Sequence, residues 1–323
     1  MHAIAEPRAF FRSAVLEIIL VVLCVALGIT APGFLTTENL LNVLRNVSMQ
    51  GLIALGMTMV IIAGEIDLSV GSMVAFGGCL TAFLTGWFAG GAGFPMPAAV
   101  GTSIAATLIA GFLLGCFTGF MRTRYQVPSF ITTLALLTGL FGAAELITNG
   151  FPLTPFPDWY NFIGGGYLFG IPFPALIFLL AFAVVHVLMN FTSFGRSVYA
   201  VGGNAEAARL SGINVTVVKI LVLAITASLA ALSGVMQSSE IMSGTATTAK
   251  GWELDVIAAV IIGGTSLMGG TGRVWGTLIG VIFLGVIMNG MTLLNVSEYW
   301  QHVVRGGLIL TAVLINRLEA RSS

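Results

Sequence analysis

The sequence predicts an all-α protein with about ten helices that cross a membrane. Of its 323 residues, 57% are hydrophobic and only 8% are charged, whereas a soluble domain carries roughly a quarter charged residues. The apolar residues form repeated runs close to the length of about 20 residues that a helix needs to cross a hydrocarbon core. The basic residues gather in every second loop between these runs. We therefore expect residues 1–323 to form one polytopic transmembrane domain.

The predicted spans form two groups of five, separated by a long loop. They are 14–30, 47–64, 68–86, 98–121, 127–147, 174–191, 217–237, 255–268, 274–294 and 301–315. The first run is expected to stay in the protein as a helix, because Pro32 after its small residues is a poor context for signal-peptide cleavage. The eighth is short and ends in glycines, so its boundaries are the least sharply marked.

The charges test this count independently. Loops on the cytoplasmic side of a membrane carry an excess of Lys and Arg, and an inside N-terminus places most of the 13 basic residues on that side. Those residues are Arg8, Arg12, Arg122, Arg124, Arg196, Arg209, Lys219, Arg273, Arg317 and Arg321. The acidic residues expected outside are Glu38, Asp158, Glu240, Glu253 and Glu298. Arg45, Lys250 and Arg305 do not follow this sorting.

The segment 150–174 is predicted to be a long outside loop. Its prolines and glycines are too frequent for a helix across the bilayer. Trp159, Tyr160 and Tyr167 within it are typical of the boundary between lipid and water. This loop is the widest surface that the chain offers to an external partner, although it can also be a simple connector.

The longest polar interruption, 192–219, is predicted to lie inside. Gly202 and Gly203 are expected to break the chain, and Asn204 to cap a short helix over 205–210. Gly212 then stands where a helix end favours a residue free to adopt a left-handed conformation. Such a helix is too short to span a membrane, and its expected use is as a projection that another protein grips.

A second group of polar residues lies within or beside the apolar spans. Carboxylates at membrane depth are costly unless they face water or a partner, which makes Glu65 and Asp67 candidates for the lining of a substrate path. Asp67 or Ser69 can instead cap the helix that follows. Glu145 and Asn289 are further candidates, and hydrogen bonding between helices is the commoner role for such groups.

Three motifs resemble those of one family. GMTMVIIAGEIDLSVGS (56–72), YAVGGNAEAARLSGIN (199–214) and ELDVIAAVIIGGTSLMGGTGRVWGTLIG (253–280) are similar in order and spacing to motifs of the ribose-type sugar permeases of ABC importers, which depend on a binding protein. The pattern Glu206-Ala207-Ala208, three residues, then Gly212 also matches the loop through which ABC importer permeases dock on their ATPase. Glu65 departs from the family, which has a small residue there.

The resemblance implies the roles of particular residues and partners. The residues expected to couple to the ATPase are Gly203, Asn204, Glu206, Ala207, Arg209 and Gly212. The implied partners are a cytoplasmic ABC ATPase subunit, a periplasmic solute-binding protein, and a second permease copy or paralogue forming a dimer, in the lipid of a bacterial inner membrane with both termini cytoplasmic. ATP would bind the partner, because the chain has no G-x-x-x-x-G-K-[ST] motif.

The expected function is translocation of a sugar, pentose- or hexose-like, without covalent chemistry. An ion-coupled secondary transporter is the main alternative, with Glu65, Asp67 and Glu145 as titrating groups. An ABC permease for branched-chain amino acids or for a furanosyl signalling molecule is another. No cofactor and no nucleic acid are expected, and His186 and His302 lack the spacing of a metal site.

Overall fold

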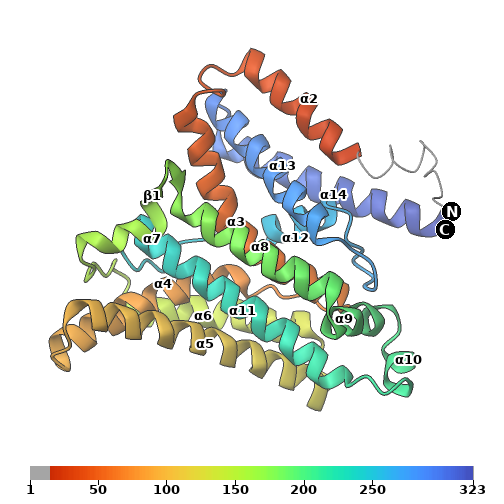
Figure 1. The fold of residues 1–323 in the computed structure, drawn as a ribbon, viewed down its shortest axis with the longest axis horizontal. Coiled ribbons are helices and arrows are strands. Elements are labelled where there is room, and N and C mark those ends of the chain that lie inside the picture. Colours follow the sequence, from red (N-terminus) through yellow and green to blue (C-terminus); the bar gives the residue numbers. More distant parts are fainter. Residues whose placement is uncertain (1–14, 323) are drawn as a thin grey trace.

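The computed structural model describes the backbone of residues 15–322 and the side chains of residues 15–314 (Figure 1). The predicted inside position of the N-terminus, with Arg8 and Arg12, lies outside the described residues, as do Ser323 and the side chains of Arg317 and Arg321. The described chain is helical apart from its loops and one two-stranded hairpin, which confirms the predicted all-α class.

The longer helices follow one another with few regular interruptions. They are α2 (Val15–Thr30), α3 (Thr37–Ile62), α4 (Val70–Gly86), α5 (Met96–Arg124), α6 (Ser129–Thr148), α8 (Phe173–Phe191), α9 (Ser193–Gly203), α11 (Val215–Glu240), α12 (Trp252–Ile262), α13 (Val274–Leu293) and α14 (Glu298–Ser322). The short elements are the π-helix η1 (Trp87–Gly91), the 3-10 helix η2 (Asp158–Asn161), α7 (Phe162–Gly165), α10 (Ala205–Leu210) and strands β1 (Tyr167–Leu168) and β2 (Ile171–Pro172).

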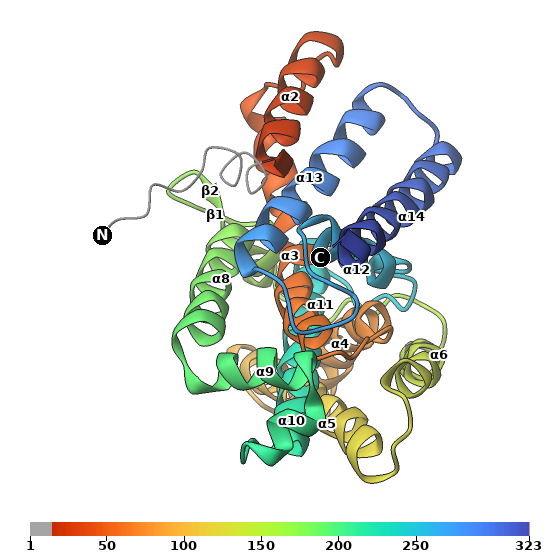
Figure 2. The same cartoon turned by 90° about the vertical axis from the view of Figure 1, so that its right-hand side faces the viewer.

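The bundle has two distinct ends. Figure 1 shows α9 and α10 together at one end of the long helices, and α7 with the β1–β2 hairpin at the other. We call these the α10 end and the hairpin end. Turned by 90°, the hairpin projects beside α8, and α6 and α14 lie on the opposite side of the bundle (Figure 2).

Seven helices among the described residues are long and apolar enough to cross a membrane. They are α3, α4 with its π-helical extension, α5, α6, α8, α11 and α13. Helices also occupy the other three predicted spans, but α2 has 16 residues, α12 has 11, and α14 is more polar. The protein is thus polytopic, and the predicted count of ten is not confirmed.

The core is built around α3, which is buried from Val47 to its end except at Gln50. Helix α11 packs against α5 through a glycine at every fourth position of α5, namely Gly111, Gly115 and Gly119. A Cβ on Gly115 would lie 2.5 Å from Ala224 Cα and Leu223 O. Small residues let helices approach closely in lipid, where van der Waals packing drives association.

The predicted outside loop is folded against the hairpin end of α11. Tyr160 is buried and its hydroxyl donates to Val235 O over 3.0 Å. Asn161 Nδ2 donates to Ser239 O over 3.1 Å, and Gly164 N donates to Ser239 Oγ over 2.8 Å. This loop is therefore a packed part of the bundle.

The structure differs from the predicted eighth span. The expected helix over 255–268 is replaced by the shorter α12, which begins at Trp252 and ends at Ile262. Residues 263–273 then form turns, because Gly264, Gly269 and Gly270 all have positive φ. A loop of glycines in this conformation cannot continue a helix.

Candidate functional site

The short helix α10 has the bounds that its capping residues predict. Asn204 has an extended backbone, and its Oδ1 accepts hydrogen bonds from Glu206 N at 3.0 Å and Ala207 N at 2.9 Å. These bonds satisfy two backbone donors that the first turn of a helix leaves unpaired. The cap therefore fixes where α10 starts relative to α9.

The other end of α10 closes through a left-handed glycine. Gly212 has φ +84°, its N–H donates to Arg209 O, and Ile213 N donates to Ala208 O, each over 3.0 Å. This pair of hydrogen bonds is the Schellman arrangement, in which the residue after the helix takes the left-handed conformation. Both ends of α10 are thus held by local backbone geometry.

The outer surface of α10 carries one ion pair and one apolar side chain. Glu206 and Arg209 form a salt bridge of 2.5 Å, and both side chains are about two-thirds exposed. This pairing holds the pKa of the Glu206 carboxyl below its usual value. Leu210 is 75% exposed beside them. An apolar side chain next to a charged pair on a projecting helix is a surface suited to protein contact.

Helix α9 contacts α3 through glycine. The expected break falls after the glycine pair: α9 continues through Gly202 and ends at Gly203, and Asn204 is extended. A Cβ on Gly202 would collide with Ile62 O and lie 2.7 Å from Gly270 N. Gly270 N itself donates to Ile62 O over 2.9 Å. We call this meeting of α9, the end of α3 and the 263–273 loop the glycine junction.

Glu65 joins three helices at the α10 end. Its side chain is only 3% exposed and accepts from Arg122 Nε of α5 at 2.8 Å and from Lys219 Nζ of α11 at 2.5 Å. Glu65 follows α3, so the two ion pairs tie α3, α5 and α11 together beside α10. Both oxygens of the carboxylate thus accept hydrogen bonds from basic side chains of the same chain.

Asp67 and Ser69 form a turn that precedes α4. Asp67 Oδ1 accepts from Ser69 N at 2.8 Å and from Ser69 Oγ at 2.6 Å. Ser69 is the N-cap residue of α4, and its side chain makes no capping bond. A buried aspartate that hydrogen-bonds two residues ahead is a standard way to shape the start of a helix.

The remaining two candidates lie elsewhere. Asn289 of α13 exchanges two hydrogen bonds with Asn39 of α3, at 2.7 and 3.0 Å. Glu145 is exposed near the hairpin end of α6, with no side-chain partner among the described residues. The structure therefore does not bring Glu65, Asp67, Ser69, Glu145 and Asn289 into one site.

The basic residues that break the charge sorting have partners in the fold. Arg45 lies 3.7 Å from Glu240, and Arg305 Nε lies 2.7 Å from Asp255 Oδ1. Lys250 Nζ lies 5.6 Å from the centre of the Phe141 ring. The departure from the positive-inside pattern was the only sign of these contacts in the sequence.

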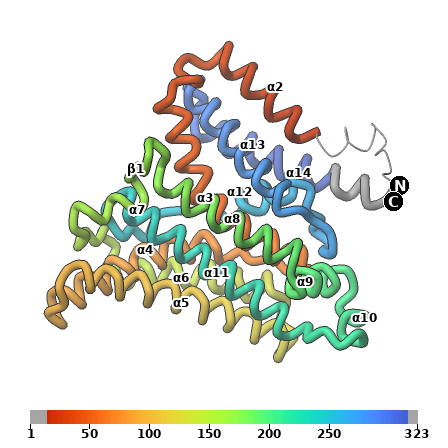
Figure 3. The backbone as a smooth tube through the Cα atoms, viewed as in Figure 1, coloured from red at the N-terminus to blue at the C-terminus, as the bar shows by residue number. Residues whose placement is uncertain are grey.

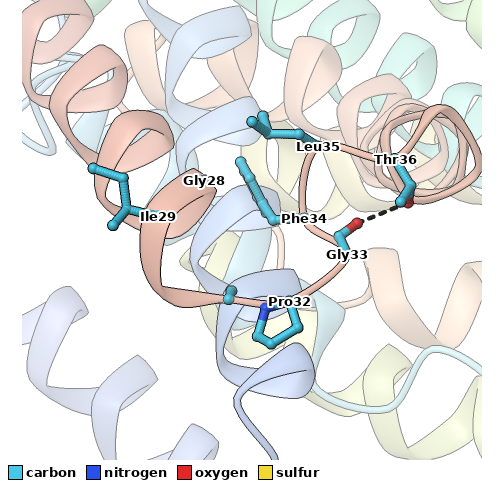
Figure 4. Close-up of a pocket in the computed structure, with 8 residues that line it drawn as sticks. Gly28, Ile29, Pro32, Gly33, Phe34, Leu35 and Thr36 are labelled. Atoms are coloured by element: carbon cyan, nitrogen blue, oxygen red, sulfur yellow. Dashed lines mark hydrogen bonds between the residues drawn. The ribbon is translucent and has the colours of Figure 1, made fainter.

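An open pocket lies in the turn between α2 and α3 (Figure 4). Gly28, Ile29, Pro32, Phe34 and Leu35 line it, and the Thr36 hydroxyl donates to Gly33 O over 2.7 Å. None of the candidate residues lies there, so this pocket does not define the site.

The bundle and the capped α10 define a polytopic membrane protein that presents a helical projection at one end. A family model described as the permease component of the branched-chain amino acid transport system matches residues 39–313. The chain belongs to this family of ABC transport permeases, as its motifs predicted. It is accordingly a transport subunit and not an enzyme.

The most similar relatives include import permeases for sugars. The chain is 43% identical to the ribose import permease protein of Bacillus subtilis (strain 168), over 93% of this chain and 91% of that protein. It is 40% identical to the ribose import permease protein of Escherichia coli (strain K12), over 98% of both. It is 34% identical to the xylose transport system permease protein of Haemophilus influenzae, over 89% and 91%. No solved structure matches the chain.

Proposed function

We propose that this protein is the membrane-spanning permease subunit of a bacterial ABC importer, and that it carries a pentose of the ribose type across the inner membrane. The observation that carries the proposal is the near full-length similarity to ribose import permeases, together with the relatives for xylose and arabinose. The family model is described by branched-chain amino acid transport, but the family also includes these sugar permeases, so its description does not fix the solute.

The α9–α10 element is the part that meets the ATPase subunit. It projects from the α10 end, which is then the cytoplasmic end, and its helix is rigidly capped. The glycine junction joins it to α3, and Lys219 joins the start of α11 to Glu65. A displacement of α10 by the ATPase would therefore be transmitted to α3 and α11 through these contacts. ATP binds the partner, a periplasmic binding protein meets the hairpin end, and a second permease copy or paralogue completes the complex.

Of the five polar candidates for the substrate path, Glu145 is the one with a free side chain. The other four form hydrogen bonds with neighbouring side chains of the fold, which supports a packing role for Glu65, Asp67, Ser69 and Asn289. A secondary carrier would use Glu65 as a titrating group, but its carboxylate is held between two cations.

Identity of the solute is tested by uptake into vesicles that contain the permease, the ATPase and the cognate binding protein. We expect ATP-dependent uptake of ribose or another pentose that survives an uncoupler. Leucine uptake, furanosyl-ligand uptake, or uptake that needs an ion gradient instead of ATP would overturn the assignment in favour of the corresponding alternative.

Changes at α10 are expected to uncouple the complex. Gly212→Val places a β-branched residue at φ +84°, which costs on the order of 1–2 kcal/mol and re-aims the helix. In Glu206→Lys, the attraction between Glu206 and Arg209 is lost, and the new lysine repels Arg209. Both variants should bind the loaded binding protein and yet lose its stimulation of ATP hydrolysis.

The matched control for the glycine is Gly212→Asn, because asparagine tolerates the left-handed conformation. This variant should retain most of the stimulated ATPase activity. If Gly212→Val and Glu206→Lys hydrolyse ATP and transport like the parent, the α9–α10 element is not the coupling element.

The orientation of the bundle is tested with single cysteines in a background that lacks Cys24, Cys79 and Cys116. Phe169 is 94% exposed at the hairpin tip, and Ser211 is exposed beside α10. An impermeant maleimide should label Phe169→Cys from outside the cell and Ser211→Cys only after the membrane is opened. Labelling of both from outside would contradict the proposed orientation.

A further inference from the structure

The connection between α11 and α12 contains a polar stretch without helix. We call residues 243–251, Ser-Gly-Thr-Ala-Thr-Thr-Ala-Lys-Gly, the threonine stretch. Figure 3 shows the chain running from the hairpin end of α11 to α12 through this segment. The sequence alone favoured an outside loop here, with Lys250 and Glu253 on the outer surface.

The contacts of the threonine stretch place it at membrane depth. A Cβ on Gly244 would lie 2.7 Å from Ala82 Cβ and 2.9 Å from Cys79 Cα, halfway along α4. A Cβ on Gly71, at the other end of α4, would collide with the Glu253 carboxylate and lie 2.9 Å from Ala249 O. The chain therefore follows α4 from Ala82 to Gly71, which is about 16 Å of a helix that spans the membrane.

Part of this stretch is open in the isolated chain. Thr247 and Lys250 are exposed, and Thr245 and Thr248 are half-buried. Irregular backbone at membrane depth is tolerated only where protein covers it or where it borders a water-filled cavity, because lipid cannot satisfy its N–H and C=O groups. Lipid therefore cannot be the neighbour of this face.

Several polar groups here have no hydrogen-bond partner within the described chain. Among the described residues, the hydroxyls of Thr247 and Thr248 have no hydrogen-bond partner. Glu253 is 9% exposed, and its Oε2 is buried without a partner. Thr245 and Thr248 also border a narrow crevice between α4 and α11, which is closed to water in this structure.

The backbone of the segment is also constrained. Met242 and Ala249 have φ of 54° and 57°, and Gly251 has φ of 86°. Such conformations are strained in residues other than glycine and persist only where the surrounding structure imposes them. The segment is thus held in a fixed, non-helical course between α4 and α12.

We propose that the threonine stretch lines the aqueous path of the transported solute, and that Thr247, Thr248 and Lys250 are its hydrogen-bonding groups. Two hydroxyls, which both donate and accept, and one ammonium donor suit a neutral polyhydroxy solute, whose hydroxyls also donate and accept. The proposal deepens the proposed function and rests on it for the class of solute. The proposed access of water to the stretch does not depend on which solute is carried.

Water access is tested by cysteine labelling of the assembled importer in lipid, in the background without native cysteines. Thr247→Cys and Lys250→Cys should react with a charged methanethiosulfonate, because only a thiol in water forms the reactive thiolate. The matched control is Ile109→Cys, which is 59% exposed at the middle of α5 on a lipid-facing surface and should stay unmodified. Failure of both threonine-stretch cysteines to react, in a complex that transports ribose, would overturn this inference and leave the proposed function intact.

The ligand role is tested with Thr248→Val, which keeps the shape and removes the hydroxyl. Uptake of the pentose at low concentrations of loaded binding protein should fall about fivefold or more, because one sugar hydroxyl is then left without its hydrogen-bond partner. Thr102→Val is the control, because its hydroxyl bonds only to its own helix on the surface of α5. Equal uptake by the Thr248→Val variant and the parent would remove Thr248 from the path. Labelling at Thr247→Cys without any sugar uptake would contradict the proposed function and not the path.

Discussion

Replacing Gly202 with valine is expected to abolish coupled transport. The added Cβ would occupy the space of the Ile62 carbonyl and separate it from Gly270 N, its hydrogen-bond donor. Forcing side-chain atoms into a filled site typically costs about 1–3 kcal/mol, and here the obstacle is backbone that cannot rotate away. Helix α9 would have to move off α3, so motion of α10 would no longer reach the bundle.

The neighbouring glycine provides a control within the same helix. A Cβ on Gly203 meets nothing within 4 Å, so Gly203→Ala should leave the contact between α9 and α3, and with it the melting temperature, unchanged. Transport and ATPase activity are measured together in reconstituted vesicles, with the melting temperature of each variant as a check on folding. If Gly202→Val transports at the parent rate, the contact between α9 and α3 does not carry the motion.

Replacing Glu65 with glutamine is expected to destabilise the α10 end strongly. Glutamine keeps the shape but leaves Lys219, whose side chain is 11% exposed, without its counter-charge. Removing one partner of a buried ion pair costs about 3 kcal/mol or more. Arg122 is 30% exposed and can recover part of its hydration, so the loss comes mainly from Lys219.

The melting temperature of the purified permease in lipid measures this effect. Glu145→Gln is the matched control, because Glu145 is exposed and its change should leave the melting temperature unaltered. A second change, Lys219→Met in the Glu65→Gln background, should restore part of the loss, since the unpaired ammonium is then gone. If the melting temperatures of Glu65→Gln and the parent are equal, the two ion pairs of Glu65 do not contribute to the stability of the fold.

The features that the sequence predicts well are those that depend on neighbours in the chain. Helix α10 has the expected bounds, Ala205–Leu210, because Asn204 and Gly212 fix its two ends through bonds to residues at most five positions away. The all-α class and most of the spans follow in the same way from apolar runs of sufficient length.

What the sequence could not predict depends on contacts between distant segments. Glu65 is 57 positions from Arg122 and 154 from Lys219, and no periodicity relates them. The threonine stretch has the composition of a surface loop, and only its packing along α4 brings it into the bundle. The early end of α12 within the predicted eighth span is set instead by the left-handed glycines Gly264, Gly269 and Gly270.

The pairing of Arg45 with Glu240 sets an order for the assembly of this chain during synthesis. Arg45 leaves the ribosome about 200 residues before Glu240, which is on the order of 10–40 s at usual rates of translation. For that interval α3, the centre of the finished core, holds a guanidinium whose counter-charge does not yet exist. The ion pair that joins α3 to α11 can therefore form only after α11 has been made, so this contact between the two halves of the protein is among the last to be completed.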